Sequence, residues 1–218
     1  MTPSRFHDRR DAGRLLAERV ASLATAQTVV LGLPRGGVPV AFEVARSLAR
    51  PLDVLVVRKL GVPFQLELAF GAIGEDDARV LDGQFVQRLG LSADVLEQVT
   101  QRERAELDRR VRRYRGGRRA LELVGRTAVI VDDGLATGAS ALVAVDVARM
   151  RGAERVIVAV PVSSREALAR LRAAAVEVIS LIVPANFMAV GEWYEDFSQT
   201  TDDEVVSLLE ASSAGDES

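Results

Sequence analysis

The chain alternates between short runs of consecutive apolar residues and longer stretches in which apolar residues recur every three or four positions. Runs of this length that are apolar throughout are typical of strands buried on both faces, as in a parallel sheet. Such runs occupy residues 28–33, 52–57, 128–131, 155–162 and 176–183. We therefore predict five strands of one buried sheet.

The stretches between these runs have the spacing of amphipathic helices. Helices are predicted at about residues 8–24, 38–49, 141–151, 164–174 and 202–211. Because strands and helices alternate, the connections are βαβ units, which place helices on both faces of a mainly parallel sheet. The predicted fold class is therefore α/β, with a doubly wound sheet flanked by helices.

Residues 64–120 interrupt this alternation, and we interpret them as an insertion that includes a charged helix. Residues 69–75 and 79–81 are predicted to pair as strands around a turn at Asp76 and Asp77. Ser92 is a suitable N-cap for a long, highly charged helix that ends near Tyr114.

The second half of the charged helix begins a basic run, formed by Arg109, Arg110, Arg112, Arg113, Arg115, Arg118 and Arg119. A solvated helix face paired with nearby acidic residues would explain this run. Contact with a nucleic acid or with a second subunit would explain it as well, although only Tyr114 interleaves an aromatic ring. We favour the solvated face and expect replacement of Arg110 to leave ligand binding unchanged.

Composition excludes several classes of site. The chain has 218 residues, a formal net charge of −3, no cysteine and a single histidine, His7. Disulfides, thiolate nucleophiles, cysteine-based zinc sites and histidine metal clusters are therefore excluded. The negative net charge gives no reason to expect nucleic-acid binding.

Length and hydropathy predict the domain organisation and the compartment. We place a single domain at residues 1–211 and a disordered polar tail at 212–218. No apolar run approaches the roughly 20 residues that span a bilayer, and the charged N-terminus lacks the apolar core of a secretory signal. We expect a cytoplasmic protein without membrane contact.

Residues 132–140, with the sequence D-D-G-L-A-T-G-A-S, join the third predicted strand to a helix. A helix N-terminus offers unpaired backbone N–H groups and the positive end of the helix dipole, which suit a phosphate. The small residues before it let phosphate oxygens reach the backbone. Asp132 and Asp133 suit sugar hydroxyls or a cation. The loop therefore predicts a site for a phosphorylated sugar.

Cationic motifs follow the first two predicted strands. In Pro34-Arg35-Gly36-Gly37, the glycine pair gives an anion access to the backbone, and Arg35 adds charge. Arg58 and Lys59 follow the second strand. Lys59 is the only lysine in the chain, so its ammonium group is either selected for function or a chance survivor. Since the carboxyl ends of parallel strands meet at one crevice, we expect these cations to face the same ligand as residues 132–140.

The loop D-D-G-L-A-T-G-A-S resembles the ribose-phosphate loop of the type I phosphoribosyltransferases, which bind 5-phosphoribosyl 1-pyrophosphate. The resemblance implies the fold of that family, with a small hood at about residues 184–211. It also implies that Asp132 and Asp133 hold the ribose hydroxyls. The 5′-phosphate would be bound by Ala136, Thr137, Gly138, Ala139 and Ser140.

The two cationic motifs fit the same family. R-K-L-G-V-P resembles a stretch of adenine phosphoribosyltransferase, and P-R-G-G resembles the pyrophosphate loop, where the peptide before the glycine is often cis. The resemblance implies that the pyrophosphate is held by Arg35, Gly36, Gly37, Arg58 and Lys59. It implies Mg²⁺ bound mostly through the substrate beside the two aspartates, and it makes Asp132, Asp133 and Lys59 the catalytic residues. Residues 64–68 would form a loop that closes over the site.

The acceptor implied by the resemblance is a nitrogen nucleophile, most simply a nucleobase in nucleotide metabolism such as purine salvage. Many 6-oxopurine enzymes of the family have an aspartate where this chain has Ala136, which argues against hypoxanthine and guanine. No hood motif for adenine, orotate or uracil is legible, so the acceptor stays open. Glu67 and Glu75 are the candidate proton acceptors. The hood rings Phe187, Trp193, Tyr194 and Phe197 either stack on a base or pack the last helix.

Two further interpretations stay open. A regulatory protein could bind the same donor without turning it over, and a nucleotide-binding structural domain could share the loop. About 27 residues precede the first predicted strand, too few for a winged-helix DNA-binding module, so we favour the enzyme. A homodimer is a further option, to which the basic helix would contribute.

Overall fold

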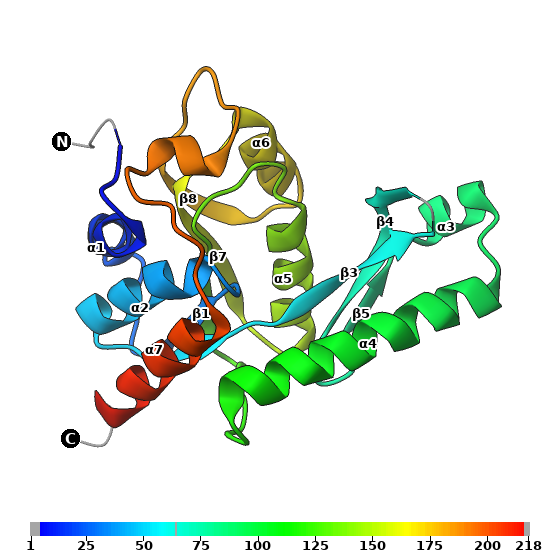
Figure 1. The fold of residues 1–218 in the computed structure, drawn as a ribbon, viewed down its shortest axis with the longest axis horizontal. Coiled ribbons are helices and arrows are strands. Elements are labelled where there is room, and N and C mark those ends of the chain that lie inside the picture. The colour runs from blue at the N-terminus through cyan, green and yellow to red at the C-terminus, as the bar shows by residue number, and fades with distance from the viewer. Residues whose placement is uncertain (1–4, 64, 216–218) are drawn as a thin grey trace.

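A five-stranded parallel sheet forms the core of the main body of the fold (Figure 1). The computed structural model describes residues 5–63 and 65–215. The strands are β1 (Thr28–Gly32), β2 (Leu52–Val54), β6 (Thr127–Val131), β7 (Arg155–Val162) and β8 (Glu177–Ile182), in the order β2-β1-β6-β7-β8. All neighbouring pairs are parallel, which confirms the predicted doubly wound sheet.

Helices cover both faces of this sheet (Figure 1). On one face lie α1 (Arg9–Val20), α2 (Gly37–Leu48) and α7 (Asp202–Gly215), and on the other lie α5 (Ala139–Met150) and α6 (Arg165–Ala173). Side chains of β6 alternate between the two layers: Val129 and Val131 join the first, and Ala128 and Ile130 join the second. Because burying one valine or isoleucine contributes about 1.5–3 kcal/mol, the apolar runs that predict the strands also hold the layers together.

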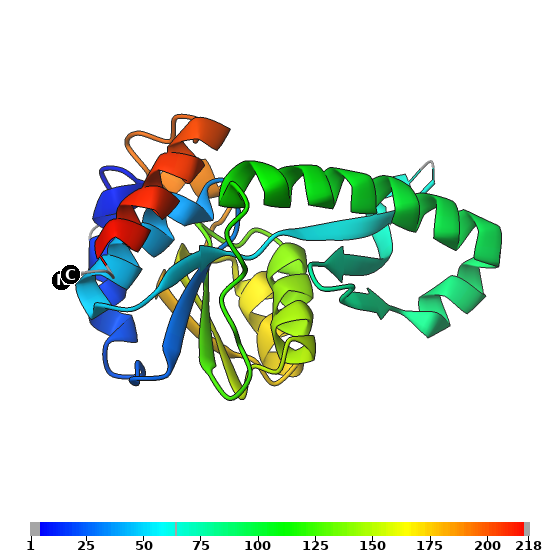
Figure 2. The same ribbon diagram turned by 90° about the horizontal axis from the view of Figure 1, so that it is seen from below.

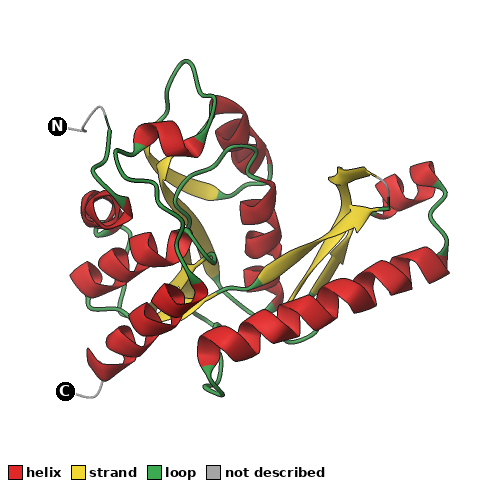
Figure 3. Cartoon of the chain, viewed as in Figure 1, coloured by secondary structure: helices red, strands yellow, loops and turns green. Residues whose placement is uncertain are grey.

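A second, antiparallel sheet projects away from the parallel one (Figures 1 and 2). It consists of β3 (Val57–Val62), β4 (Gln65–Gly74) and β5 (Arg79–Leu81), in that order. After α3 (Gly83–Leu89), the long helix α4 (Ala93–Arg115) runs back along this sheet (Figure 3). We call residues 57–115 the arm. The arm confirms the predicted strand pair and charged helix, and it begins earlier than the predicted residue 64.

Residues 52–68 differ from the prediction. The strand β2 ends at Val54, and Arg58 and Lys59 lie inside β3 rather than in a loop after a strand. Leu60 and Val62 are buried while Lys59 is exposed, which is the alternation of a strand with one buried face. Residues 65–68, predicted as a closing loop, begin β4 instead, and Phe64 lies outside the described residues.

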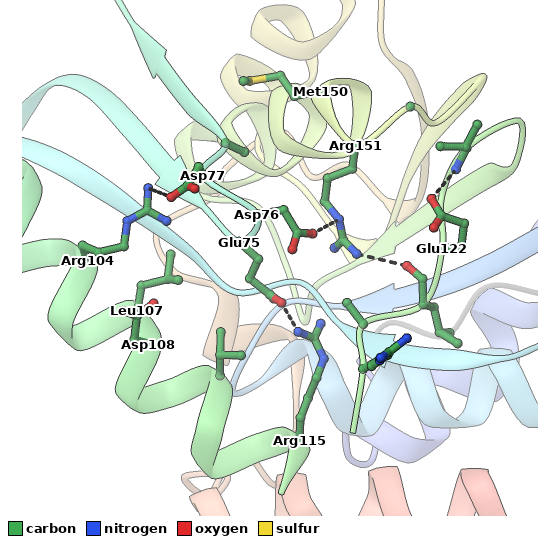
Figure 4. A pocket seen from close by; sticks show the side chains of 17 residues that line it. Glu75, Asp76, Asp77, Arg104, Leu107, Asp108, Arg115, Glu122, Met150 and Arg151 are labelled. Carbon is green, nitrogen blue, oxygen red and sulfur yellow. Dashed lines mark hydrogen bonds and ion pairs between the residues drawn. The ribbon is translucent and has the colours of Figure 1, made fainter. Parts of the chain in front are cut away.

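Arg115 anchors the arm to the parallel sheet. Its guanidinium donates to both carboxylate oxygens of Asp53 at 3.1 Å, and it also donates to Glu75 (Figure 4). The three side chains are 5%, 9% and 6% exposed. Because a buried charge without its partner is strongly destabilising, this network fixes the end of α4 against β2 and the end of β4. Glu75, one predicted proton acceptor, is therefore engaged in a structural ion pair.

The turn between β4 and β5 is held by two further ion pairs (Figure 4). Asp76 and Asp77 have φ angles of 54° and 58°, in the left-handed region that aspartate tolerates better than most residues. Arg151 lies 3.1 Å from Asp76, and Arg104 lies 3.4 Å from Asp77. This turn, α4 and the end of α5 enclose a cavity of about 1110 Å³. Its lining holds five carboxylates (Glu75, Asp76, Asp77, Asp108 and Glu122) against four arginines (Arg104, Arg115, Arg119 and Arg151), so it does not favour an anion.

The C-terminal segment extends further as a helix than predicted. After η1 (Val190–Trp193), α7 continues to Gly215, so the prediction of a disordered tail is wrong for residues 212–215. The carbonyl of Leu209 accepts from the Ser213 hydroxyl at 2.9 Å and from Arg118 at 3.3 Å, which supports this turn. Residues 216–218 lie outside the described part. Among the described residues, no helix combines the length and apolarity needed to cross a membrane.

Candidate functional site

The loop from Asp132 to Gly138 joins β6 to α5 at the carboxyl end of the parallel sheet. Gly138, at the helix N-cap, has a φ of 72°, which glycine adopts without strain. The Thr137 hydroxyl accepts from the backbone N–H of Ala139 at 3.4 Å. Ser140 lies in the first turn of α5, so the loop presents small residues at a helix N-terminus, as predicted for a phosphate site.

Two residues, one of α6 and one at its N-cap, hold this loop by donating hydrogen bonds to the loop's backbone carbonyls. The Ser164 hydroxyl donates to the carbonyl of Ala136 at 2.6 Å. Arg170 donates to the carbonyl of Thr137 at 3.3 Å. Since these bonds use loop carbonyls, they fix the backbone without occupying the N–H groups that a phosphate needs.

Asp132 is half-buried and precedes a second carboxylate, that of Asp133. Its Oδ1 accepts from the backbone N–H of Asp133 at 2.9 Å. Burial raises the pKa of the Asp132 carboxyl well above its ordinary value, and the charge of Asp133 raises it further. Two carboxylates in this setting favour ligands that donate hydrogen bonds or carry positive charge.

Asp133 accepts hydrogen bonds from Arg9, near the N-terminus, and from Tyr194, in the C-terminal segment. The Nε of Arg9, in the first turn of α1, donates to its Oδ2 at 2.9 Å, and the Tyr194 hydroxyl donates to its carbonyl at 2.6 Å. Arg9 also donates to the carbonyl of Ser198 at 2.7 Å and lies 3.9 Å from the ring centroid of Phe197. Burial raises the pKa of Asp133, while the Arg9 guanidinium opposes the rise. Arg9 is a site residue that the sequence analysis missed.

Gly36 and Gly37 are required by the close approach of two loops. A Cβ on Gly36 would lie 2.0 Å from Oδ2 of Asp133. A Cβ on Gly37 would lie 2.5 Å from the carbonyl oxygen of Val131 and 2.8 Å from Cα of Asp132. The cis peptide bond of this loop lies between Pro34 and Arg35. It is not the bond between Arg35 and Gly36, which directly precedes the glycine.

Seven of the twelve predicted site residues line two adjoining cavities rather than one. The first, which we call the Lys59 cavity, has a volume of about 380 Å³ and includes Pro34, Arg58, Lys59, Asp132 and Ser140. The second, which we call the Arg35 cavity, has a volume of about 330 Å³ and includes Arg9, Arg35, Gly36, Asp133 and Phe197. The consecutive pairs Pro34–Arg35 and Asp132–Asp133 divide them. Neither lining includes Gly37, Ala136, Thr137, Gly138 or Ala139.

The two cations on β3, Arg58 and Lys59, differ in whether they form an ion pair. Arg58 donates two hydrogen bonds to Glu103 of α4, at 2.9 and 2.6 Å. Lys59 is exposed and has no ion-pair partner among the residues that the structure describes. Lys59 is therefore the freer of the two to meet an anion.

The helix α4 contributes to the Lys59 cavity through Arg102, Glu103 and Arg110. The interpretation of α4 as a solvated face paired with acidic residues fits Arg109 and Arg110, which pair with Glu106 at 2.8 and 2.7 Å, although Arg110 also lines the Lys59 cavity. The interpretation is wrong for Arg115, which is buried. The sequence carries a signal that Arg110 faces inward. It lies about one helical turn from each of the buried residues Leu107 and Tyr114.

The acidic pair does not form a protein-only metal site. Within residues 5–63 and 65–215, no group of three or more histidine, cysteine, aspartate or glutamate side chains could hold a metal ion. Asp132 and Asp133 supply two carboxylates, which suits Mg²⁺, because this ion usually takes one or two carboxylates and completes its shell with substrate phosphates and water.

The aromatic residues of the predicted hood fall into different environments. Tyr194 is buried and packs at a ring-centroid distance of 5.5 Å from Phe6. Phe197 is 37% exposed and lines the Arg35 cavity. Packing therefore accounts for Tyr194, whereas Phe197 is placed where it could meet a ligand. The side chain of Glu67 lies outside the described residues.

Comparisons with known proteins agree on one family. The family model of the phosphoribosyl transferase domain matches residues 5–197. A Mycobacterium tuberculosis protein, provisionally named as a phosphoribosyl transferase, is 58% identical over 205 residues, which are 94% of this chain. The chain spans 46% of the length of that relative.

Two solved structures share the fold of this chain. The crystal structure of TT1426 from Thermus thermophilus has a TM-score of 0.87 at 49% identity, covering 94% of this chain and 97% of that one. The AQ2163 protein from Aquifex aeolicus has a TM-score of 0.52 at 14% identity over 84% of this chain and 78% of that one, and shares the fold. A domain match over residues 5–197 and a solved relative of nearly equal extent show that this chain belongs to the phosphoribosyltransferase family.

Proposed function

We propose that the protein transfers a 5-phosphoribosyl group from 5-phosphoribosyl 1-pyrophosphate to a nitrogen acceptor and releases diphosphate. The observation that carries the proposal is the placement of Asp132 and Asp133 between two cavities that both contain cations. One ligand that carries a sugar and two separate anionic groups would use both the carboxylates and the cations around them.

In the proposed complex, Asp132 and Asp133 accept hydrogen bonds from the ribose hydroxyls. Residues 136–140 bind the 5′-phosphate at the N-terminus of α5. The diphosphate lies in the Lys59 cavity and extends toward Arg35 past Pro34, which is supported by the excess of cationic side chains that line the Lys59 cavity. Mg²⁺, when bound, would be held through the substrate beside the two aspartates and would neutralise diphosphate charge.

The reaction breaks the bond between ribose C1 and the diphosphate oxygen, and the electron pair leaves with that oxygen. The acceptor nitrogen forms the new bond to C1 and releases its proton to water. Positive charge develops on the ribose as the leaving group departs, and fixed carboxylates beside the ring stabilise it. Lys59 stabilises the charge that accumulates on the diphosphate. The protein's contribution is therefore positioning and electrostatic stabilisation.

The acceptor is proposed to be a nucleobase that enters beside Phe197. This ring is exposed within the Arg35 cavity, which Asp133 also lines, so a planar acceptor there would lie next to the ribose. Many 6-oxopurine enzymes of the family have an aspartate at the position of Ala136, so its absence here argues against hypoxanthine and guanine and leaves the other bases of nucleotide metabolism open.

A donor-binding regulatory protein is the second candidate. The observation that favours it is the ion pair between Arg9 and Asp133, because this pair already engages one of the two carboxylates that the ribose would use. In that case the donor would bind without turnover.

Incubation with the donor, Mg²⁺ and each nucleobase in turn, with diphosphate release as the readout, tests the proposal. Release that depends on a particular base supports transfer and identifies the acceptor. Saturable donor binding without release by any base would support the regulatory candidate. Absence of donor binding would contradict both.

A further inference from the structure

Between Val99 and Tyr114, the inward stripe of α4 carries two charged residues among buried apolar side chains. Val99, Leu107 and Tyr114 are buried on this face, and Glu103 and Arg110 continue the same stripe at helical spacing. Placing charges on a buried stripe is costly unless they have partners. Glu103 pairs with Arg58 and Arg102, and Arg110 pairs with Glu106.

Arg110 faces the Lys59 cavity together with three other cations. The lining contains Arg58, Lys59, Arg102 and Arg110, against the two carboxylates of Glu103 and Asp132. A cavity with more positive than negative groups attracts an anion, and low-dielectric walls strengthen that attraction. The cations come from β3 and α4, so an anion bound there would bridge the two elements of the arm.

The guanidinium of Arg110 is oriented by one hydrogen bond and keeps donors available for a ligand. Its Nε donates to Oε1 of Glu106 at 2.7 Å, and Glu106 lies four residues earlier on the same helix. This bond fixes the plane of the guanidinium and leaves its two NH₂ groups without a hydrogen-bond partner among the described residues. Arg58 differs, because Glu103 takes both its Nε and its Nη2.

Tyr114, one turn beyond Arg110, links this face to the loop of Arg35. Its hydroxyl donates to Asp202 at 2.9 Å, and a guanidinium nitrogen of Arg35 lies 4.0 Å from the same carboxylate. Burial and the bond to Asp202 raise the pKa of Tyr114 to about 12, and the charges of Arg110 and Arg35 both oppose this rise. Arg110 and Arg35 therefore lie near the same tyrosine and approach the site from different elements.

We infer that Arg110 binds the diphosphate part of the donor, as a binding residue supplied by α4. This inference rests on the proposed function. The diphosphate is the only part of the donor that would lie between Lys59 and Arg35, whereas the 5′-phosphate would lie at residues 137–140 of a different loop. Loss of Arg110 should therefore affect one anionic end of the donor and spare the other.

Calorimetric titration with two separate probes, inorganic diphosphate with Mg²⁺ and ribose 5-phosphate, tests this assignment. The variants are Arg110→Gln, Arg110→Lys and the matched control Arg109→Gln. Arg109 also pairs with Glu106 but lines neither cavity. Its replacement therefore removes an ion pair to Glu106 without removing a charge from either cavity. Thermal unfolding of each variant checks that the fold is intact.

Arg110→Gln is expected to weaken diphosphate binding about tenfold, as for loss of a charge-assisted hydrogen bond, and to leave ribose 5-phosphate binding within about twofold. Arg110→Lys should recover part of the loss, and Arg109→Gln should bind both probes like the unmodified protein. Equal diphosphate affinity in Arg110→Gln and Arg109→Gln would overturn the inference while leaving the proposed function intact. Equal loss for both probes would also overturn it. An unmodified protein that binds neither probe would overturn the proposed function and this inference together.

Discussion

The Nε of Arg9 donates to Oδ2 of Asp133 at 2.9 Å and so joins the first turn of α1 to the candidate donor loop. The same aspartate accepts from Tyr194 through its backbone carbonyl at 2.6 Å. Segments near the two ends of the chain therefore meet at one residue, Asp133. Arg9 is 11% exposed and Asp133 is 16% exposed, so water competes little for this pair.

Replacing Arg9 with alanine should weaken donor binding, because Asp133 would lose the cation that orients its carboxylate and opposes the rise in its pKa. A largely buried acceptor left without its partner also costs about 1–3 kcal/mol in the free energy of unfolding. Titration with the donor and chemical denaturation measure the two effects. Arg14→Ala is the control, since Arg14 lies on the same helix but is 51% exposed and pairs with Asp11 at 3.5 Å. If both variants bound the donor equally well, Arg9 would have no positioning role.

Gly36→Ala should abolish donor binding or reduce it by at least tenfold. The added methyl group would lie 2.0 Å from Oδ2 of Asp133, so the carboxylate or the loop must move. The control is Gly83→Ala, because a methyl group there meets nothing within 4 Å. Gly83→Ala should bind normally and leave stability unchanged or slightly higher. Normal binding by Gly36→Ala would show that the contact between the two loops is not needed.

Arg115→Met should destabilise the fold by about 3–5 kcal/mol, because Asp53 and Glu75 would remain buried without a cation. For a chain of this size the midpoint of thermal unfolding should fall by roughly 6–20 °C. Arg112→Met, an exposed position on the same helix, should change the midpoint little. Equal midpoints for the two variants would mean that the network contributes no net stability.

Tyr114 should make stability depend on alkaline pH. Its pKa is raised from 10.0 to about 12 in the folded protein, so the unfolded chain loses the phenolic proton first. Its contribution is therefore fully present below pH 10 and is lost as the pH rises toward 12. Tyr114→Phe should be less stable than the unmodified protein at pH 8, because the bond to Asp202 is missing, and the difference should shrink between pH 10 and 12. Denaturation at several pH values measures this, and a constant difference would contradict the assignment.

The central sheet and the donor loop could be predicted because their signals are local. The strand β6 is apolar throughout, and the small residues before α5 follow directly in the chain. The region around Lys59 was harder, because charged residues followed by Gly61 and Pro63 suggested a loop. The alternation of exposed Lys59 with buried Leu60 and Val62 was the signal for a strand.

Long-range pairs explain what the sequence analysis missed. The partners Arg9 and Asp133 are separated by 124 positions, and nothing near either residue predicts that they meet. Arg110 had a local signal, since it continues the buried stripe of α4, but an arginine among many arginines was attributed to solvation. Only the placement of α4 over β3 shows which arginine of the run lines the Lys59 cavity.

Donor binding by the Asp133→Asn variant tests the central claim most directly. The claim is that the carboxylates of residues 132 and 133 hold the ribose of a phosphorylated donor. Calorimetry with 5-phosphoribosyl 1-pyrophosphate and Mg²⁺ should give saturable binding to the unmodified protein and affinity at least tenfold lower for Asp133→Asn. Asp203→Asn, at a carboxylate that is 84% exposed, should bind normally. Equal affinity of the unmodified protein and Asp133→Asn, or no binding by either, would contradict the account.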